Sequence, residues 1–149
     1  MRIGIVGHAS DKFTINGMLK AQEAIYDIFS KHIHDKPIIV SGNCPLGGVD
    51  LWAEEAAKLA RLQTDIKSPK QHQWDAEYGF KQRNLDIAKD SDIIYVILSD
   101  SFPPEYNKKK FPYCYHCKTD QHIKSGGCWT AHQAIKMGKK AEWIVVCNK

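Results

Sequence analysis

The sequence predicts an α/β fold, a single domain built on a mainly parallel, doubly wound sheet. Apolar, β-branched runs typical of buried strands occupy residues 2–7, 37–40, 92–98 and 142–147. Between these runs, apolar residues recur every three or four positions, as on one face of a helix. Strands that alternate with helices in this way pair in parallel, and the helices cover both faces of the sheet.

The first half of the chain predicts two strand–helix units. The helix after the first strand ends near residue 34, and its apolar stripe contains Ile15, Met18, Leu19, Ile25, Ile28 and Phe29. The helix after the second strand ends near residue 62, and its apolar positions are 49, 52, 53, 56, 57, 59 and 60. Residues 64–68 then predict a short edge strand.

The second half begins with a polar loop at 69–79, followed by a helix at 80–89 that leads into the strand at 92–98. An insertion of about residues 99–125 comes next, rich in Pro, Lys and aromatic residues and without periodicity. A connection of this length in a compact domain is usually functional or is held by something other than a core. A helix from residue 126 to about 137, closed by Gly138, precedes the last strand.

The composition describes a soluble globular chain. It has 149 residues, of which 43% are hydrophobic and 26% are charged. No apolar run is long enough to cross a bilayer and no signal-peptide pattern is present, so we expect a cytoplasmic protein with no membrane partner. The net charge of +4 fits an anionic small molecule as well as a polymer. A homo-oligomer is compatible with all of this.

Two glycine-rich loops each lead from a predicted strand or insertion into a helix, at 41–48 and 125–127. Helix N-termini bind anions because their first N–H groups are free and the helix dipole points at the ligand. A third loop, at 7–12, ends at the same edge of a parallel sheet. We expect a nucleotide-like ligand there, while ordinary tight turns remain the alternative. The residues expected in this site are Gly7, His8, Ser41, Gly42, Gly47, Gly48, Asp50, Ser125, Gly126, Gly127 and Thr130.

The order and spacing of these motifs resemble the SLOG superfamily of Rossmann-like domains, which includes the LOG phosphoribohydrolases and the DNA-processing protein A family. The resemblance spans nearly the whole chain, and the motifs that carry it are Ile5-Val6-Gly7, Ser41-Gly42, Gly47-Gly48-Val49-Asp50, Arg83-Asn84 and Ser125-Gly126-Gly127-Cys128-Trp129-Thr130. It implies a Rossmann-like fold and a pocket for a nucleotide or ribose-phosphate compound. It also implies that Arg83 contacts phosphate, with a solvated helix arginine as the alternative. Asn84 either holds a ribose hydroxyl or bonds to nearby backbone.

LOG-type enzymes carry the signature Pro-Gly-Gly-x-Gly-Thr-x-x-Glu, whose glycines bind phosphate and whose Glu is catalytic. In this chain Gly126, Gly127 and Thr130 match, whereas Ser125 replaces the Pro and Trp129 replaces the third Gly. Gln133 stands at the position of the Glu, and an amide cannot act as a general base. An N-glycosidase acting on nucleoside monophosphates is therefore an alternative function, and its candidate catalytic carboxylates are Asp50, Glu54 and Glu55.

A cysteine and histidine cluster in the insertion predicts a metal site. Cys114, Cys117, His122 and Cys128 form the pattern Cys-x₂-Cys-x₄-His-x₅-Cys, a donor set suited to structural Zn²⁺. His116 or His132 is an alternative ligand, and four unrelated residues in a lysine-rich loop are the plain alternative. A redox Cys-x-x-Cys is the lesser alternative, because thioredoxin-like motifs open a helix after a strand and this one does not. We expect no redox cofactor.

Aromatic residues leave two further alternatives open. Trp74 and Tyr78 either stack on a base or pack against the sheet edge, whereas Trp52 and Trp143 lie on apolar faces and are expected in the core. Residues 108–113 join three lysines to Phe111 and Tyr113. Together with a zinc knuckle they would suit single-stranded nucleic acid, a third candidate function, which the modest net charge does not favour.

Overall fold

The computed structural model describes residues 1–149 and confirms the α/β fold. One all-parallel, five-stranded sheet has the strand order β3-β2-β1-β4-β5. Its strands are β1 (Arg2–Gly7), β2 (Ile38–Ser41), β3 (Gln63–Ile66), β4 (Ile93–Ser99) and β5 (Lys140–Val146). The order reverses between β1 and β4, which creates a switch point in front of their carboxyl ends. The predicted edge strand is confirmed as β3.

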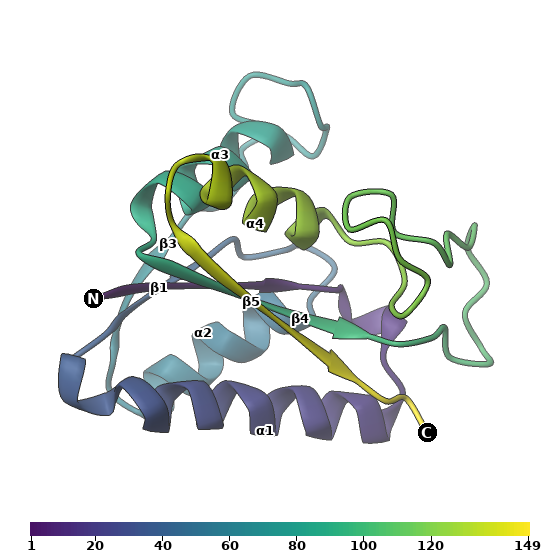
Figure 1. The fold of residues 1–149 in the computed structure, drawn as a ribbon, viewed down its shortest axis with the longest axis horizontal. Coiled ribbons are helices and arrows are strands. Elements are labelled where there is room, and N and C mark those ends of the chain that lie inside the picture. The colour runs from purple at the N-terminus through teal and green to yellow at the C-terminus, as the bar shows by residue number, and fades with distance from the viewer.

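Four α-helices cover the sheet on its two faces, as the doubly wound prediction requires (Figure 1). Helices α1 (Ile15–His32) and α2 (Val49–Leu59) lie on one face, and α3 (Phe80–Asp90) and α4 (Gly126–Lys136) lie on the other. Short 3-10 helices, η1 (Ser10–Lys12) and η2 (Ile33–Asp35), flank α1. The sheet therefore separates two apolar cores.

Strand β4 shows how the sequence builds both cores. All seven of its residues are buried, and successive side chains point to opposite faces of the sheet. Ile93, Tyr95 and Ile97 pack with α1 and α2, while alternate residues pack with α3 and α4. A strand buried on both faces reads as a continuous apolar run, which is why the sequence predicts it so clearly.

The predicted apolar stripe of α1 is wrong at two positions. The side chains of Ile15 and Leu19 are 75% and 55% exposed, whereas Ile25, Ile28 and Phe29 are buried. At ~100° per residue, Ile15 and Leu19 point roughly 80° and 120° away from Ile25 around the helix axis. Sequence spacing alone did not separate residues at the border of the stripe from residues at its centre.

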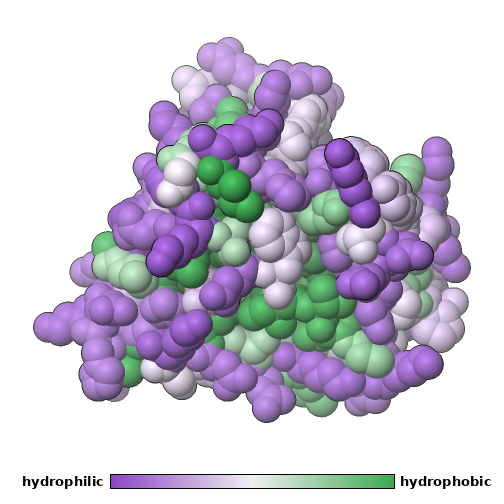
Figure 2. Space-filling view, in the orientation of Figure 1, coloured by the Kyte–Doolittle hydropathy of each residue, from purple (hydrophilic) through white to green (hydrophobic).

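One face of the molecule keeps apolar side chains exposed. Figure 2 shows an apolar area on the face where β5 and α1 lie, and the exposed apolar residues of these two elements include Ile15, Leu19 and Val145. Strand β5 is also an edge strand, so its outer backbone groups are open to pairing. The expected homo-oligomer stays a prediction. None of the helices is both long enough and apolar enough to span a membrane.

The predicted insertion contains no helix or strand beyond an isolated bridge between Cys114 and Thr119. It leaves the end of β4 and returns beside the first turn of α4 (Figure 1). Backbone hydrogen bonds fix its return path, since the Lys124 N–H donates to the Phe111 carbonyl over 3.1 Å and the Ile123 N–H donates to the Ser99 carbonyl over 3.4 Å. The insertion is thus placed at the switch point of the sheet.

Candidate functional site

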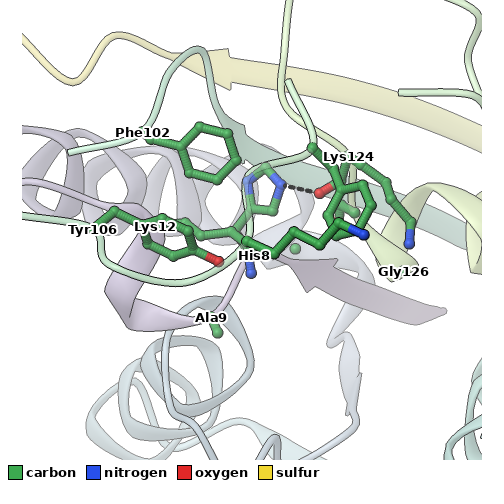
Figure 3. A pocket seen from close by; sticks show the side chains of 11 residues that line it. His8, Ala9, Lys12, Phe102, Tyr106, Lys124 and Gly126 are labelled. Atoms are coloured by element: carbon green, nitrogen blue, oxygen red, sulfur yellow. Dashed lines mark hydrogen bonds between the residues drawn. The ribbon is translucent and has the colours of Figure 1, made fainter. Parts of the chain in front are cut away.

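Two cavities open at the carboxyl ends of β1 and β4. The larger has a volume of about 300 Å³ (Figure 3), and the smaller has a volume of about 160 Å³. Gly7, at the end of β1, and Gly126, at the start of α4, line both of them. The cavities are therefore neighbours at the switch point, where parallel α/β sheets bind their ligands.

The larger cavity combines positive charge with aromatic rings. Three of its lining residues are lysines, three are aromatic, and none is acidic: Lys12, Lys109, Lys124, Phe102, Tyr106 and Phe111. Figure 3 shows the Phe102, Tyr106 and His8 rings gathered around it. All of these lysines and aromatic residues except Lys12 belong to the insertion. Lys109 and Phe111 were expected only in a nucleic-acid surface, and Lys124, Phe102 and Tyr106 were not predicted as site residues, although the Lys and aromatic content of the insertion was the available signal.

The lysines of this cavity lie close to aromatic rings and to one another. The Lys124 ammonium lies 5.0 Å from the centre of the Phe111 ring, and the Lys109 ammonium lies 5.2 Å from it. Burial lowers the pKa of Lys12, and the charges of Lys108 and Lys124 lower it further, although Asp11 opposes them. An anion bound among these ammonium groups would relieve their mutual repulsion.

His8, expected to contact phosphate, lies in the wall of this cavity as a neutral residue. Its Nε2 lies 2.9 Å from the Lys124 carbonyl oxygen (Figure 3), and its Nδ1 accepts a hydrogen bond from the Ser99 N–H over 3.0 Å. Burial lowers the pKa of His8 to about 3. With both nitrogens engaged and no charge, the imidazole ties the loop after β1 to the insertion and leaves the phosphate contacts to other groups.

Three of the predicted phosphate-binding glycines are explained by packing. A Cβ on Gly7 would lie 2.0 Å from the Ile97 carbonyl oxygen, and one on Gly48 would lie 2.4 Å from the His8 carbonyl oxygen. A Cβ on Gly127 would lie 3.1 Å from the Gly7 nitrogen. Backbones that approach this closely have no room for a side chain, so these glycines bring the three loops together.

Gly126 differs from the other glycines of the site. It is exposed, its φ lies outside the left-handed region, and a Cβ built on it meets no atom within 4 Å. Neither backbone conformation nor packing requires glycine there, yet the open space in front of it is the junction of the two cavities. A missing side chain at a helix N-terminus lets a ligand approach the backbone.

The smaller cavity gathers the predicted residues Asp50, Arg83, Asn84 and Thr130. Arg83 is strongly engaged with the protein, because it donates to the Gly42 carbonyl and to the Asn84 side-chain oxygen. Its guanidinium also lies 3.8 Å from the Asp50 carboxylate, and the two side chains are only 10% and 9% exposed. Arg83 thus holds the wall of this cavity and compensates a buried charge.

The loop at 41–48 contributes less to the cavities than the sequence predicted. The Ser41 hydroxyl is buried and donates to the Asp50 carbonyl oxygen over 3.2 Å, and Gly47 adopts a φ of +75° that favours glycine. At the N-terminus of α2, the Val49 N–H already donates to the His8 carbonyl over 3.1 Å. At the N-terminus of α4, the Ser125 side chain accepts a hydrogen bond from the Gly127 N–H over 3.0 Å, and Gly126 lines both cavities.

The three candidate carboxylates have different environments. Burial raises the pKa of Asp50 to about 6, and the nearby Arg83 charge opposes that shift. Burial and the charge of Asp50 raise the pKa of Glu54 to about 7, and both of its carboxylate oxygens are buried without a hydrogen-bond partner. Glu55 is exposed. Of the three, Asp50 is the one whose residue lines a cavity.

The predicted metal ligands come together. The donor atoms of Cys114, Cys117, His122 and Cys128 all lie within 4.8 Å of one another, close enough to hold a metal ion. A tetrahedral zinc site with bonds of about 2.3 Å places its sulfur ligands roughly 3.8 Å apart. The His122 Nδ1 lies 2.9 Å from the Ile123 carbonyl, which leaves Nε2 for the metal.

The structure also settles which histidine belongs to this cluster. The Nε2 of His132 lies 3.4 Å from the Cys117 sulfur, so His132 contacts a ligand instead of replacing one. His116 is outside the cluster and lines a separate cavity beside Trp129. Cys128 lies in the first turn of α4, so the cluster joins the insertion to that helix.

The predicted aromatic residues divide between core and surface. Trp52 and Trp143 are partly buried against the two cores, which confirms the expectation for them. Trp74 and Tyr78 are 40% and 53% exposed, so neither plugs the sheet edge completely.

The fold and the cluster together define a single-domain α/β protein with a Rossmann-like parallel sheet and a candidate metal centre. A scan against models of known protein families finds no match, and a search of curated proteins finds none either. Membership of the SLOG superfamily therefore stays a prediction from the motifs.

The contrast between the two glycines of α4 gives a direct test of the site. Gly127→Ala should lower the free energy of unfolding by about 1–3 kcal/mol, because its Cβ would press on the backbone of Gly7. Gly126→Ala should leave stability unchanged or raise it by about 0.4–1 kcal/mol, since alanine restricts the unfolded chain. Urea unfolding of both variants measures this difference. If both variants lost the same free energy of unfolding, Gly126 would also be a packing residue.

Proposed function

We propose that this domain binds a phosphorylated nucleoside at the carboxyl edge of its sheet. The observation that carries the proposal is the larger cavity, in which three lysines and three aromatic rings lie beside Gly126 at the N-terminus of α4, with no acidic residue in the lining. Lysines and helix N-termini bind phosphate, and aromatic faces bind bases. Neither the phosphate-binding groups alone nor the aromatic rings alone would indicate a nucleotide.

The size of the cavities supports a ligand that uses both. Small-molecule sites usually have volumes of about 300–1,000 Å³. The larger cavity, at about 300 Å³, is at the lower end of that range, and the smaller, at about 160 Å³, is below it. We assign base and phosphate to the larger cavity. The smaller, with the Asp50 carboxylate and the Asn84 amide, suits the ribose hydroxyls.

Lys124 provides the test of this assignment. Lys124→Met keeps the aliphatic stem and removes the charge, so affinity for a nucleoside 5′-monophosphate should fall by about 1.5–3 kcal/mol, the scale of a hydrogen bond to a charged group. Calorimetry with the four common ribonucleoside monophosphates, and with the matching nucleosides, measures this. The nucleosides should bind more weakly and should not respond to the substitution.

Lys110→Met is the matched control, because Lys110 is an exposed lysine of the same insertion that lines neither cavity. Gly126→Ala should weaken binding without loss of stability. If all four monophosphates bind wild type and Lys124→Met equally, or if none binds wild type, the proposal is wrong. Tighter binding of single-stranded oligonucleotides than of mononucleotides would instead favour a nucleic-acid interface.

The second candidate function is hydrolysis of the same ligand, and Asp50 is the observation that favours it. Its carboxylate lies in the wall of the smaller cavity, where the ribose is assigned. An ionised carboxylate there would stabilise positive charge on the sugar as the bond from C1′ to the base breaks and water adds to C1′. Gln133 does not supply that charge, so we expect slow turnover.

Any such hydrolysis should depend on pH through Asp50. Because burial raises the pKa of Asp50 to about 6, the catalytic carboxylate form predominates only above that pH, and the rate should rise about tenfold from about pH 5 to about pH 7. Asp50→Asn should abolish it, and Gln133→Glu should raise it. Chromatography of the released base follows the reaction. If Asp50→Asn releases the base at an unchanged rate, Asp50 is excluded as the catalytic carboxylate, and Glu54 is tested next.

We further propose that the cysteine and histidine cluster binds one structural Zn²⁺. The donor set of three sulfurs and one nitrogen matches closed zinc sites, in which protein fills all four positions. The His122–Ile123 hydrogen bond orients the imidazole in the way that zinc ligands usually are. The ion would hold the insertion, and with it Lys109, Phe111 and Lys124, against the first turn of α4.

Elemental analysis should find one zinc per chain in protein purified without added metal or a metal-binding tag. Cys114→Ser should lose the metal and reduce nucleotide affinity while far-UV circular dichroism shows the sheet intact, because the core under α1 and α2 contains no residue of the cluster, although Cys114 and Cys128 belong to the core under α3 and α4. Cys147→Ser is the control, since Cys147 lies outside the cluster. Zinc that stays well below one equivalent after zinc is supplied would contradict the proposal.

A further inference from the structure

A third cavity, greater in volume than the two described above, adjoins the larger of those two at the start of α4. It has a volume of about 510 Å³ and is lined by Trp74, Tyr115, His116, Lys124, Gly126 and Trp129. Two of these residues, Lys124 and Gly126, also line the larger cavity. The proposed function leaves this cavity without a role, and its walls are largely aromatic.

The tryptophans of this cavity come from elements far apart in the sequence. Trp74 belongs to the loop between β3 and α3, and Trp129 belongs to the first turn of α4. Their rings pack edge to face, with centres 4.8 Å apart and planes at 78°. In this arrangement one ring supports the other and leaves a face open, and Trp74 remains 40% exposed.

Lys124 lies between the two cavities. Its ammonium is 5.0 Å from the centre of the Phe111 ring on one side and 5.0 Å from the centre of the Tyr115 ring on the other. Its main chain is fixed, because its carbonyl oxygen lies 2.9 Å from the His8 Nε2. A positive charge and the exposed Gly126 thus mark the junction of two aromatic-lined spaces, which is where a phosphate would lie.

We propose that the ligand is a dinucleotide, with one base in the larger cavity, a second base against Trp74 and Trp129, and the linking phosphates at Lys124 and Gly126. This inference rests on the proposed nucleotide binding and names its ligand class. Two aromatic subsites on either side of a single phosphate subsite match two bases joined through phosphates. A mononucleotide would leave one of the two aromatic subsites empty.

Charge argues against two other occupants. An aromatic cage for a cationic ligand would not contain Lys124 beside the rings. A groove for a longer nucleic acid would need a basic track that continues beyond the junction. Of the lysine run at 108–110, Lys109 lines the cavity, whereas the Lys108 ammonium is paired with the Asp11 carboxylate at 2.8 Å.

The experiment measures, by calorimetry on the full-length, metal-loaded protein, the affinities of di(adenosine-5′) pyrophosphate and AMP. The corresponding guanine compounds, di(guanosine-5′) pyrophosphate and GMP, are compared in the same way. The dinucleotide should bind at least about tenfold more tightly than the mononucleotide. Trp74→Ala should weaken the dinucleotide roughly 5- to 150-fold, the effect of losing one base-stacking ring, and should leave the mononucleotide unchanged. Tyr115→Ala should also weaken binding of the dinucleotide.

Tyr78→Ala is the control, because Tyr78 is an exposed aromatic of the same loop that does not line this cavity. Dinucleotide should quench tryptophan fluorescence in wild type and in Tyr78→Ala, and much less in Trp74→Ala. Equal affinity for the dinucleotide and the mononucleotide overturns this inference and leaves the proposed function standing. If none of these nucleotides binds, the proposed function itself fails.

Discussion

The closest contact in the site is between backbones, and the remaining features depend on it. The end of β1 passes so near to β4 that Gly7 has no room for a Cβ, and the start of α4 packs tightly on Gly7, where a Cβ on Gly127 would lie 3.1 Å from the Gly7 nitrogen. The loop before α2 meets the segment after β1 at Gly48. These approaches converge at the switch point of the sheet. They bring the loop after β1, the loop before α2 and the start of α4 together around the two cavities, because no side chain separates the backbones.

The insertion supplies most of the chemistry of that space without any regular structure of its own. Ordering an irregular segment costs about 1–2 kcal/mol per residue in backbone entropy, which an apolar core would normally offset. Here the compensating contacts include the backbone bonds of Lys124 to Phe111 and of Ile123 to Ser99, the contact of Lys124 with His8, and the buried cluster that joins Cys114 to α4. The geometry of the larger cavity therefore depends on the same residues that can hold a metal ion.

The sequence predicted the fold well because the fold follows from periodicity. The central strands are largely apolar runs, as at 93–99, the edge strands β3 and β5 are more mixed, and each helix shows a stripe. The site was predicted in part. The metal ligands share a local pattern, whereas the lining of the larger cavity depends on how an aperiodic loop returns to the sheet. The role of a glycine also depends on three-dimensional neighbours, so spacing did not distinguish Gly126 from Gly127.

The charges of the site are arranged in a way that sequence cannot show. The acidic residues Asp50 and Glu54 lie on α2, where Arg83 faces Asp50 and burial raises the pKa of both carboxyls. The lysines that line the larger cavity come from the insertion, as Lys109 and Lys124, and from η1, as Lys12. An anion at Gly126 would meet ammonium groups on one side and a largely compensated carboxylate on the other. The uncompensated charge at the junction is thus positive, although the whole chain carries only +4.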